Sequence, residues 1–137
     1  ATATGSAYTD LGLTKGTRYY YVVTAVDSAG LESPVSLEAS AVPLGPPTAP
    51  SNLGASVISR SQINLTWKDR SNDETGFTLE RSLDQLNFKV VATVASNTTQ
   101  FSDTGLAANT LYYYRVRAYN TAGSSSYTPV VSKRTSR

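Results

Sequence analysis

Residues 101–123, FSDTGLAANTLYYYRVRAYNTAG, decide the fold class because the chain contains this segment twice. Residues 8–30, YTDLGLTKGTRYYYVVTAVDSAG, align with it without a gap, at a shift of 93 residues. A shift of roughly 90 to 100 residues is the size of one β-sandwich module. A full module length of chain leads up to the second copy, whereas only seven residues precede the first. The repeat therefore predicts the C-terminal half of one module followed by one whole module.

Side chains within the repeated segment alternate with a period of two, which is typical of a strand that buries one face. The same alternation in the first copy places Tyr19 and Tyr21 inward and Tyr20 outward. In the second copy the inward face carries Tyr112, Tyr114, Val116 and Ala118. The outward face carries Tyr113, Arg115, Arg117 and Tyr119.

Three further segments of the second copy read as strands. Residues 62–68 alternate Ile63, Leu65 and Trp67 with polar side chains, and residues 88–94 form a short apolar run. Residues 76–82 place Phe77 and Leu79 inward and Thr78 and Glu80 outward. Turn sequences lie between these segments, and no window shows a sustained helical period. The chain is therefore predicted to be all-β, with helix content close to nil.

Composition excludes several function classes. The chain has 12 basic and 10 acidic residues, scattered so that no basic stripe suits a phosphate backbone, and nucleic acid is not an expected partner. No stretch approaches the roughly 18 apolar residues of a membrane span, so no membrane insertion is expected. The absence of Cys and His excludes thiolate or imidazole zinc sites and Ser/His/Asp chemistry. We expect no catalytic residues, no cofactor and no metal.

Residues 43–50, PLGPPTAP, hold four of the six prolines. Proline fixes its own φ and lacks an N–H for a sheet ladder, so this run predicts a stiff, extended connector. The expected organisation is a half-module over residues 1–43, a linker over 44–50 and a complete module over 51–137. Because the chain contains no Met, Ala1 is not a translation start, and we expect a processed product, an excised fragment or the ordered part of a longer chain.

The motifs of the second copy resemble a fibronectin type III module of the bacterial extracellular kind. They are APSNL, INLTW, the Gly-Phe-x-Leu-Glu-Arg strand, FSDTGL, and LAANTLY running into YYRVRAYNTAG. The resemblance covers residues 47–137, and residues 1–46 resemble only the strands lettered E, F and G. It implies an immunoglobulin-like β-sandwich in which Trp67 is core and Tyr112 and Tyr19 form tyrosine corners. The expected structural core is Tyr19, Tyr21, Ile63, Leu65, Trp67, Phe77, Leu79, Leu106, Tyr112, Tyr114 and Val116.

Two acidic patterns invite a chemical interpretation. The loop over residues 69–76, DRSNDETG, begins like a calcium loop, but its Gly stands eighth and not sixth, and Glu80 at the twelfth place belongs to a strand. Turn chemistry explains the loop better. Glu80 with Glu74 or Asp73 could be proposed as a glycosidase pair, yet nothing suggests a cleft that would raise one pKa, and a solvated surface is the better account.

The sequence favours a non-catalytic pair of modules that spaces or docks other domains of a larger secreted bacterial protein, polysaccharide-acting or on the cell surface. The expected location is extracellular or at the cell surface, and the expected partners are other domains of the same or a neighbouring chain. The alternative is direct binding of polysaccharide or a cell surface. Its candidate face is Tyr20, Tyr113, Arg115, Arg117 and Tyr119.

The half-module raises a question of stability. Residues 1–46 contain no counterpart of Ile63, Leu65, Trp67, Phe77 or Leu79, the side chains expected to cover its tyrosines. Some 40 residues without those partners bury too little apolar surface to offset their ordering entropy. We expect the half-module to be completed by chain outside this sequence, by a neighbouring copy, or by packing on the second module.

Overall fold

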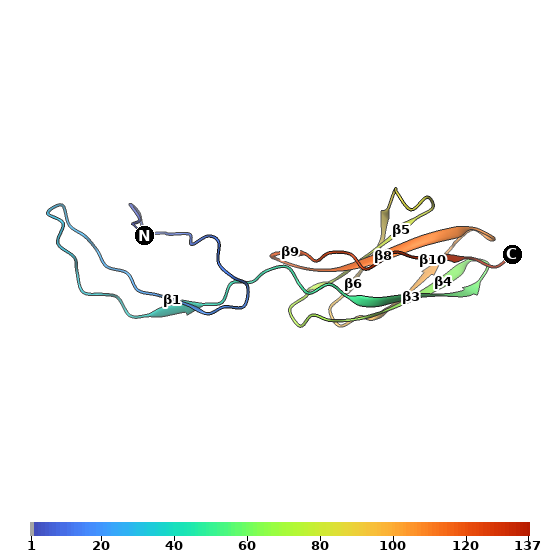
Figure 1. Ribbon diagram of the computed structural model, residues 1–137, viewed down its shortest axis with the longest axis horizontal. Helices are drawn as coiled ribbons and strands as arrows, with labels where there is room; N and C mark the ends of the chain where they lie inside the picture. The colour runs from blue at the N-terminus through green and yellow to red at the C-terminus, as the bar shows by residue number, and fades with distance from the viewer. Residues whose placement is uncertain (1) are drawn as a thin grey trace. The chain divides into compact units, whose positions relative to one another are not determined.

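The computed structural model describes residues 2–137, and this part of the chain consists of ten strands joined by turns and irregular segments, without a helix (Figure 1). The all-β prediction is confirmed. No helix in the described residues is long and apolar enough to cross a membrane. The chain divides into two compact units, Ala1–Gly45 and Pro46–Arg137, so that the division falls inside the proline-rich run.

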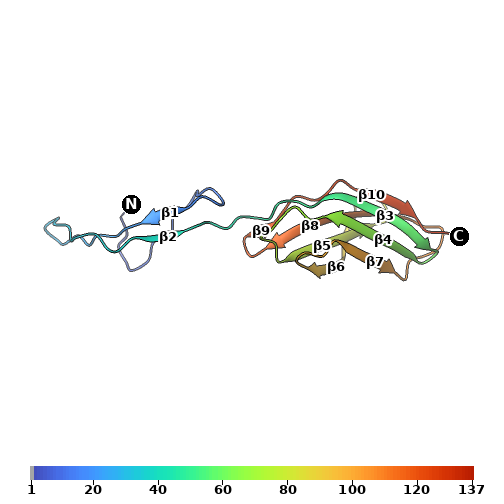
Figure 2. The same ribbon diagram turned by 90° about the horizontal axis from the view of Figure 1, so that it is seen from below.

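The first unit contains one antiparallel pair of strands, β1 (Tyr19–Tyr21) and β2 (Ala39–Ala41), which lie side by side in Figure 2. An isolated bridge joins Val26 to Glu32. Residues 100–104 of the second unit form a strand. Their counterpart in the first unit, residues 7–11, does not. In the second unit that strand pairs only with residues 62–66, and the first unit has no equivalent of them to complete the ladder.

The second unit is a sandwich of two antiparallel sheets, as the alternation predicts (Figures 1 and 2). One sheet has the order β3–β4–β7, built from β3 (Ser51–Ser59), β4 (Gln62–Lys68) and β7 (Gln100–Thr104). The other has the order β10–β8–β5–β6, and β9 pairs with β8. Its strands are β5 (Gly76–Ser82), β6 (Lys89–Ala95), β8 (Leu111–Asn120), β9 (Gly123–Ser124) and β10 (Val131–Arg134).

The core of the second unit lies between the inward faces of β4, β5 and β8. The ring centroids of Trp67 and Phe77 are 5.6 Å apart in its interior. Fully burying one such side chain contributes roughly 1.5 to 3 kcal/mol, so this layer supplies most of the sandwich's stability. The buried apolar residues are Ile63, Leu65, Trp67, Phe77, Leu79, Leu106, Tyr112, Tyr114, Val116 and Ala118.

A polar bridge crosses the interior between the two sheets. Nη1 of Arg81, on β5, donates to both carboxylate oxygens of Asp103, on β7, over 3.0 and 2.9 Å. The hydroxyl of Tyr114 donates to Oδ2 of Asp103 over 2.9 Å. Burial, followed by the nearby Asp103 carboxylate, raises the pKa of Tyr114 above its ordinary range, so the phenol stays a donor. The buried carboxylate is therefore fully occupied in holding the sheets together.

The same local contacts recur in the first unit without the burial. Tyr19 Oη accepts a hydrogen bond from the Thr14 amide over 3.0 Å, as Tyr112 Oη does from the Ala107 amide over 2.9 Å. Tyr19 and Tyr21, which the alternation assigns to a core, are only half-buried. The hydrogen bond to the tyrosine hydroxyl joins residues five positions apart and therefore forms locally. Burial of the tyrosine ring needs an opposing sheet, which residues 2–45 do not form. None of residues 2–45 is buried.

Candidate functional site

The outward face of β8 brings together four of the five residues in the expected ligand face. Tyr113, Arg115, Arg117 and Tyr119 all lie half-buried on this strand. Tyr20, the fifth, is 62% exposed and belongs to the first unit. We call the four β8 residues, with Glu80, Phe88 and Tyr127 beside them, the β8 outer face.

Arg115 is held on every side. Its Nε and Nη2 lie 2.8 and 2.6 Å from Oε2 of Glu80, the residue opposite it on β5. Its guanidinium stacks between two rings, 4.1 Å from the Phe88 centroid and 3.9 Å from that of Tyr127. Stacking of a guanidinium on aromatic faces adds electrostatic attraction to apolar contact. Arg115 is therefore committed to the fold.

Glu80 is the anion of this cluster, and its environment corrects the expectation of a solvated outward carboxylate. Glu80 is only 7% exposed, because Arg115 and Tyr127 cover it, and Tyr127 Oη donates to its Oε1 over 2.5 Å. Burial raises the pKa of Glu80, but the hydrogen bonds from Tyr127 and Arg115 and the charges of Arg115 and Arg117 outweigh it, so the net pKa is lowered. A carboxylate with a lowered pKa does not serve as a general acid near neutral pH.

Arg117 differs from Arg115 in having no anion of its own. Its guanidinium lies 4.8 Å from the Tyr127 centroid, opposite Thr78 in the ladder. Within the described residues it forms no ion pair, and its Nε is buried without a hydrogen-bond partner. The two arginines and Glu80 leave one uncompensated positive charge at the middle of the β8 outer face.

Tyr119 is positioned by a glycine on the neighbouring strand. Gly76 lies opposite Tyr119, and a Cβ on it would stand 3.0 Å from the Tyr119 hydroxyl oxygen and 3.2 Å from Cζ. The end of the ring therefore lies over Gly76, in space that any other residue would fill. Tyr113, at the other end of the row, lies opposite Ser82 on β5 and Ser132 on β10.

Sequence reasoning did not anticipate Glu80, Phe88 and Tyr127 as members of this face. Glu80 and Arg115 are 35 residues apart and are brought together by the register of β5 and β8, whereas Tyr127, 47 residues from Glu80, reaches it from the segment between β9 and β10. The one available signal was the opposite charge of Glu80 and Arg115 at outward positions of their strands. This signal becomes informative only once the two strands are known to pair.

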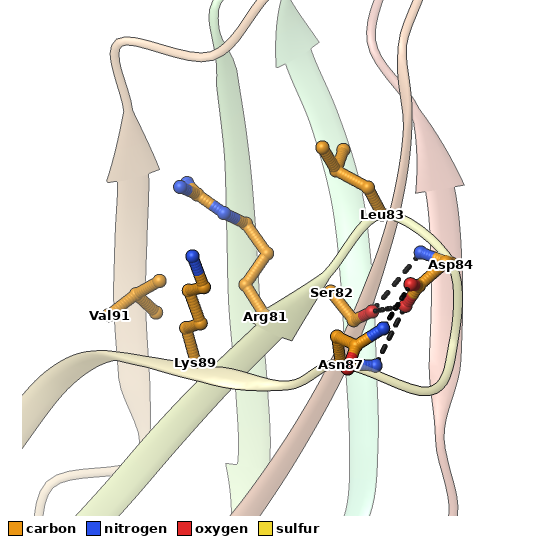
Figure 3. Close-up of a pocket in the computed structure, with 7 residues that line it drawn as sticks. All are labelled: Arg81, Ser82, Leu83, Asp84, Asn87, Lys89 and Val91. Atoms are coloured by element: carbon orange, nitrogen blue, oxygen red, sulfur yellow. Dashed lines mark hydrogen bonds between the residues drawn. The ribbon is translucent and has the colours of Figure 1, made fainter.

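A second candidate is a hollow of about 360 Å³ at the β5–β6 turn, shown in Figure 3. Arg81 and Lys89, which pair across the two strands, extend in the same direction at its edge. Asp84 is fully used by the turn: it accepts from the Asn87 amide over 2.8 Å and the Asn87 side chain over 2.6 Å, as well as from Ser82 and Leu86. These bonds, led by that of the Asn87 amide, hold the Asp84 pKa well below its ordinary range. No carboxylate here is placed for acid–base chemistry.

The acidic loop before β5 is organised by its own hydrogen bonds. Oδ1 of Asp69 accepts from the Ser71 amide over 3.0 Å, and the Ser71 hydroxyl donates to Asp73 over 2.6 Å. Oε1 of Glu74 accepts from the Asn97 amide over 3.2 Å. In residues 2–137 no group of three or more acidic, His or Cys residues is placed to hold a metal ion. Glu74 and Glu80 have separate partners and share no site.

Comparison with known proteins gives one family and a set of longer relatives. The family model described as "Fibronectin type III domain" matches residues 48–134. Chitinase A1 of Niallia circulans is 37% identical over 130 residues, which are 90% of this chain and 18% of the chitinase. Exoglucanase B of Cellulomonas fimi is 34% identical over 134 residues, 92% of this chain and 12% of that enzyme. The chain thus spans less than a fifth of the length of these relatives.

Solved structures agree on the fold. Domains A168–A170 of titin match with a TM-score of 0.69 at 22% identity, over 92% of this chain and 44% of that one. The FN1–FN3 domains of chicken CNTN1 match with a TM-score of 0.66 at 22% identity, over 95% and 46% of the two chains. At this level of identity the likeness concerns architecture alone.

Proposed function

Because this chain belongs to the fibronectin type III domain family, we propose that it is a non-catalytic pair of modules within a larger polysaccharide-acting protein. It spaces, orients or docks the other domains of that protein, which is secreted or displayed at the cell surface. Its partners are those domains or the domains of a neighbouring chain. The proline-rich run at residues 43–50 serves as the connector between its two units.

The observation that carries this proposal is the engagement of Glu80 and Asp103, two of the three buried carboxylates. The third, Glu74, accepts a hydrogen bond from the Asn97 amide at Oε1, and its Oε2 is buried without a partner in the described residues. Glu80 is bound by Arg115 and Tyr127, and Asp103 by Arg81 and Tyr114. A catalytic acid or base needs a carboxyl group within reach of substrate and a pKa suited to proton transfer. The relatives support the same assignment, since a segment of this kind forms a small fraction of a chitinase and of an exoglucanase.

The test replaces this 137-residue segment, within the parent protein, with a flexible Gly/Ser linker of equal length. A spacing role predicts unchanged hydrolysis of a soluble oligosaccharide and slower hydrolysis of the insoluble polymer. Loss of activity on the soluble substrate would place chemistry in this chain and contradict the proposal. Restoring an unrelated β-sandwich pair in place of the linker is the matched control, because it returns stiffness without this surface.

A second candidate function is direct polysaccharide binding, and the row of Tyr113, Arg117 and Tyr119 on the β8 outer face favours it. Aromatic rings with polar tips contact a sugar's apolar face and its hydroxyls at once. Pull-down with insoluble polysaccharides tests this function, with Tyr113→Ala and Tyr119→Ala as the variants and Tyr20→Ala testing the first unit separately. Retention of binding in all three variants would rule out these faces.

A further inference from the structure

We propose that the β8 outer face binds a carboxylated polysaccharide, and that Arg117 receives the carboxylate. This inference rests on the second candidate function and specifies its ligand. The site lies on the outward face of a sheet, where the row Tyr113–Arg115–Arg117–Tyr119 runs along one strand. The ligand class follows from the charge, the rings and the position of β8 in the sheet.

The net positive charge of the β8 outer face favours an anionic ligand. Arg115 forms an ion pair with Glu80 at 2.6 Å, whereas Arg117 forms no ion pair with a carboxylate of the described residues. Arg117 is half-buried and stacks on Tyr127, so its guanidinium is partly desolvated and held in place before a ligand arrives. A positioned, partly desolvated guanidinium binds a carboxylate more strongly than a freely moving surface cation does.

The tyrosine rings on either side of Arg117 favour a sugar as the ligand. Tyr119 follows Arg117 by two residues on the same face, and its ring is fixed over Gly76. Tyr113 ends the row in the other direction. Six residues separate the two tyrosines, which is about 20 Å at a strand rise of roughly 3.4 Å per residue. A row of this length suits a polymer lying along the strand better than it suits a single sugar ring.

The place of β8 in the sheet argues against a peptide as the ligand. Extended peptides are recognised by adding a strand to a sheet edge, where backbone N–H and C=O groups are unpaired. On one side β8 pairs with β5 over Tyr113–Tyr119. On the other side β10 pairs with Leu111–Tyr114, and Thr128 and Ser125 bond the backbone of Val116 and Ala118, so the backbone groups of β8 are used and only side chains face outward. Nucleic acid is disfavoured as well, since phosphate-backbone binding needs several free cations and this face has one.

The test measures binding of polygalacturonate to the intact chain by calorimetry at low salt, beside the same polymer with its carboxyl groups reduced. We expect binding of the acidic polymer, weakening with added salt, and at least tenfold weaker binding of the reduced one, or about 1.4 kcal/mol. Arg117→Gln is expected to lose a similar factor, and Arg117→Lys to recover part of it. The matched control is Arg60→Gln, which removes the same charge from the exposed turn between β3 and β4.

Each other outcome counts against the proposal. Equal affinity for both polymers overturns the carboxylate assignment and leaves sugar binding in place. Binding of neither polymer overturns this inference and leaves the spacing function untouched, because that function is tested on the parent protein. An equal loss in Arg60→Gln and Arg117→Gln, with unchanged unfolding of both variants, shows attraction by net charge and overturns the site.

Discussion

Tyr114 donates a hydrogen bond to Oδ2 of Asp103 over 2.9 Å, and the equivalent pair 93 residues earlier, Tyr21 and Asp10, makes the same bond over 3.1 Å. In the second unit the bond is buried and Arg81 completes it. In the first unit the bond is exposed, and its carboxylate has no counterpart of Arg81. The repeat therefore preserves a contact whose energetic importance depends on burial, because water competes for an exposed hydrogen bond.

Asp103→Asn is expected to destabilise the second unit by about 2 to 3 kcal/mol, since it removes the charge of a buried carboxylate to which both Arg81 and Tyr114 donate. Urea unfolding measures the change, and Asp10→Asn is the matched control, with an expected loss below about 0.5 kcal/mol because the hydrogen bond between Tyr21 and Asp10 is exposed. A similar cost for both variants would contradict the role given to burial.

Gly76→Ala is expected to cost about 3 kcal/mol, because the new Cβ would stand 2.2 Å from the backbone oxygen of Val94 and close to the Tyr119 ring. Backbone cannot move aside as a side-chain tip can. The control is Gly54→Ala, where the nearest atom is the Thr66 hydroxyl at 3.2 Å, which can rotate away. Thermal unfolding compares the two variants, and an equally small loss in both would refute the close packing at Gly76.

The lowered pKa of Glu80 predicts an acid-dependent loss of stability. A carboxyl group whose pKa is lower in the folded chain contributes stability above its ordinary value of 4.5, and loses that contribution as the pH falls through the folded pKa. The difference in unfolding free energy between the natural chain and Glu80→Gln should therefore shrink as the pH falls below about 4.5.

Denaturant unfolding from pH 7 to pH 2 measures this difference. Tyr127→Phe keeps the ring that stacks on Arg115 and removes one donor to Glu80, so its pH dependence should be weaker than that of the natural chain. A difference between the natural chain and Glu80→Gln that stays constant with pH would show that Glu80 does not act through its charge.

The two units should differ when each is produced alone. Residues 46–137 contain the buried core. Alone, they are expected to unfold cooperatively, with the same midpoint of unfolding as in the full chain. Residues 1–45 alone are expected to give the circular dichroism spectrum of an unordered chain. None of residues 2–45 is buried, and Leu11 and Leu37 are 81% and 94% exposed. A cooperative transition in the isolated first unit would contradict this expectation.

Much of the sandwich follows from period-two alternation. The strand over residues 62–68 has the expected bounds, and the one expected at 88–94 is shifted by one residue, to Lys89–Ala95. Alternation is readable because successive side chains of a strand face opposite ways whatever lies opposite them. β3, with a register shift at each end, and the two-residue β9 carry no such clean pattern, and neither was anticipated.

The sequence by itself determined which side chains of β4, β5 and β8 face inward, and the local contacts of Tyr19 and Tyr112, since these depend on neighbours within a few residues. Only the tertiary structure decided that Tyr112 is buried while Tyr19 is half-exposed, and that Glu80 is enclosed by Arg115 and Tyr127. The burial and ion pairing of Glu80 depend on residues 35 and 47 positions away in the sequence. The register of the strands is set by the packing of the whole sandwich, which no local pattern contains.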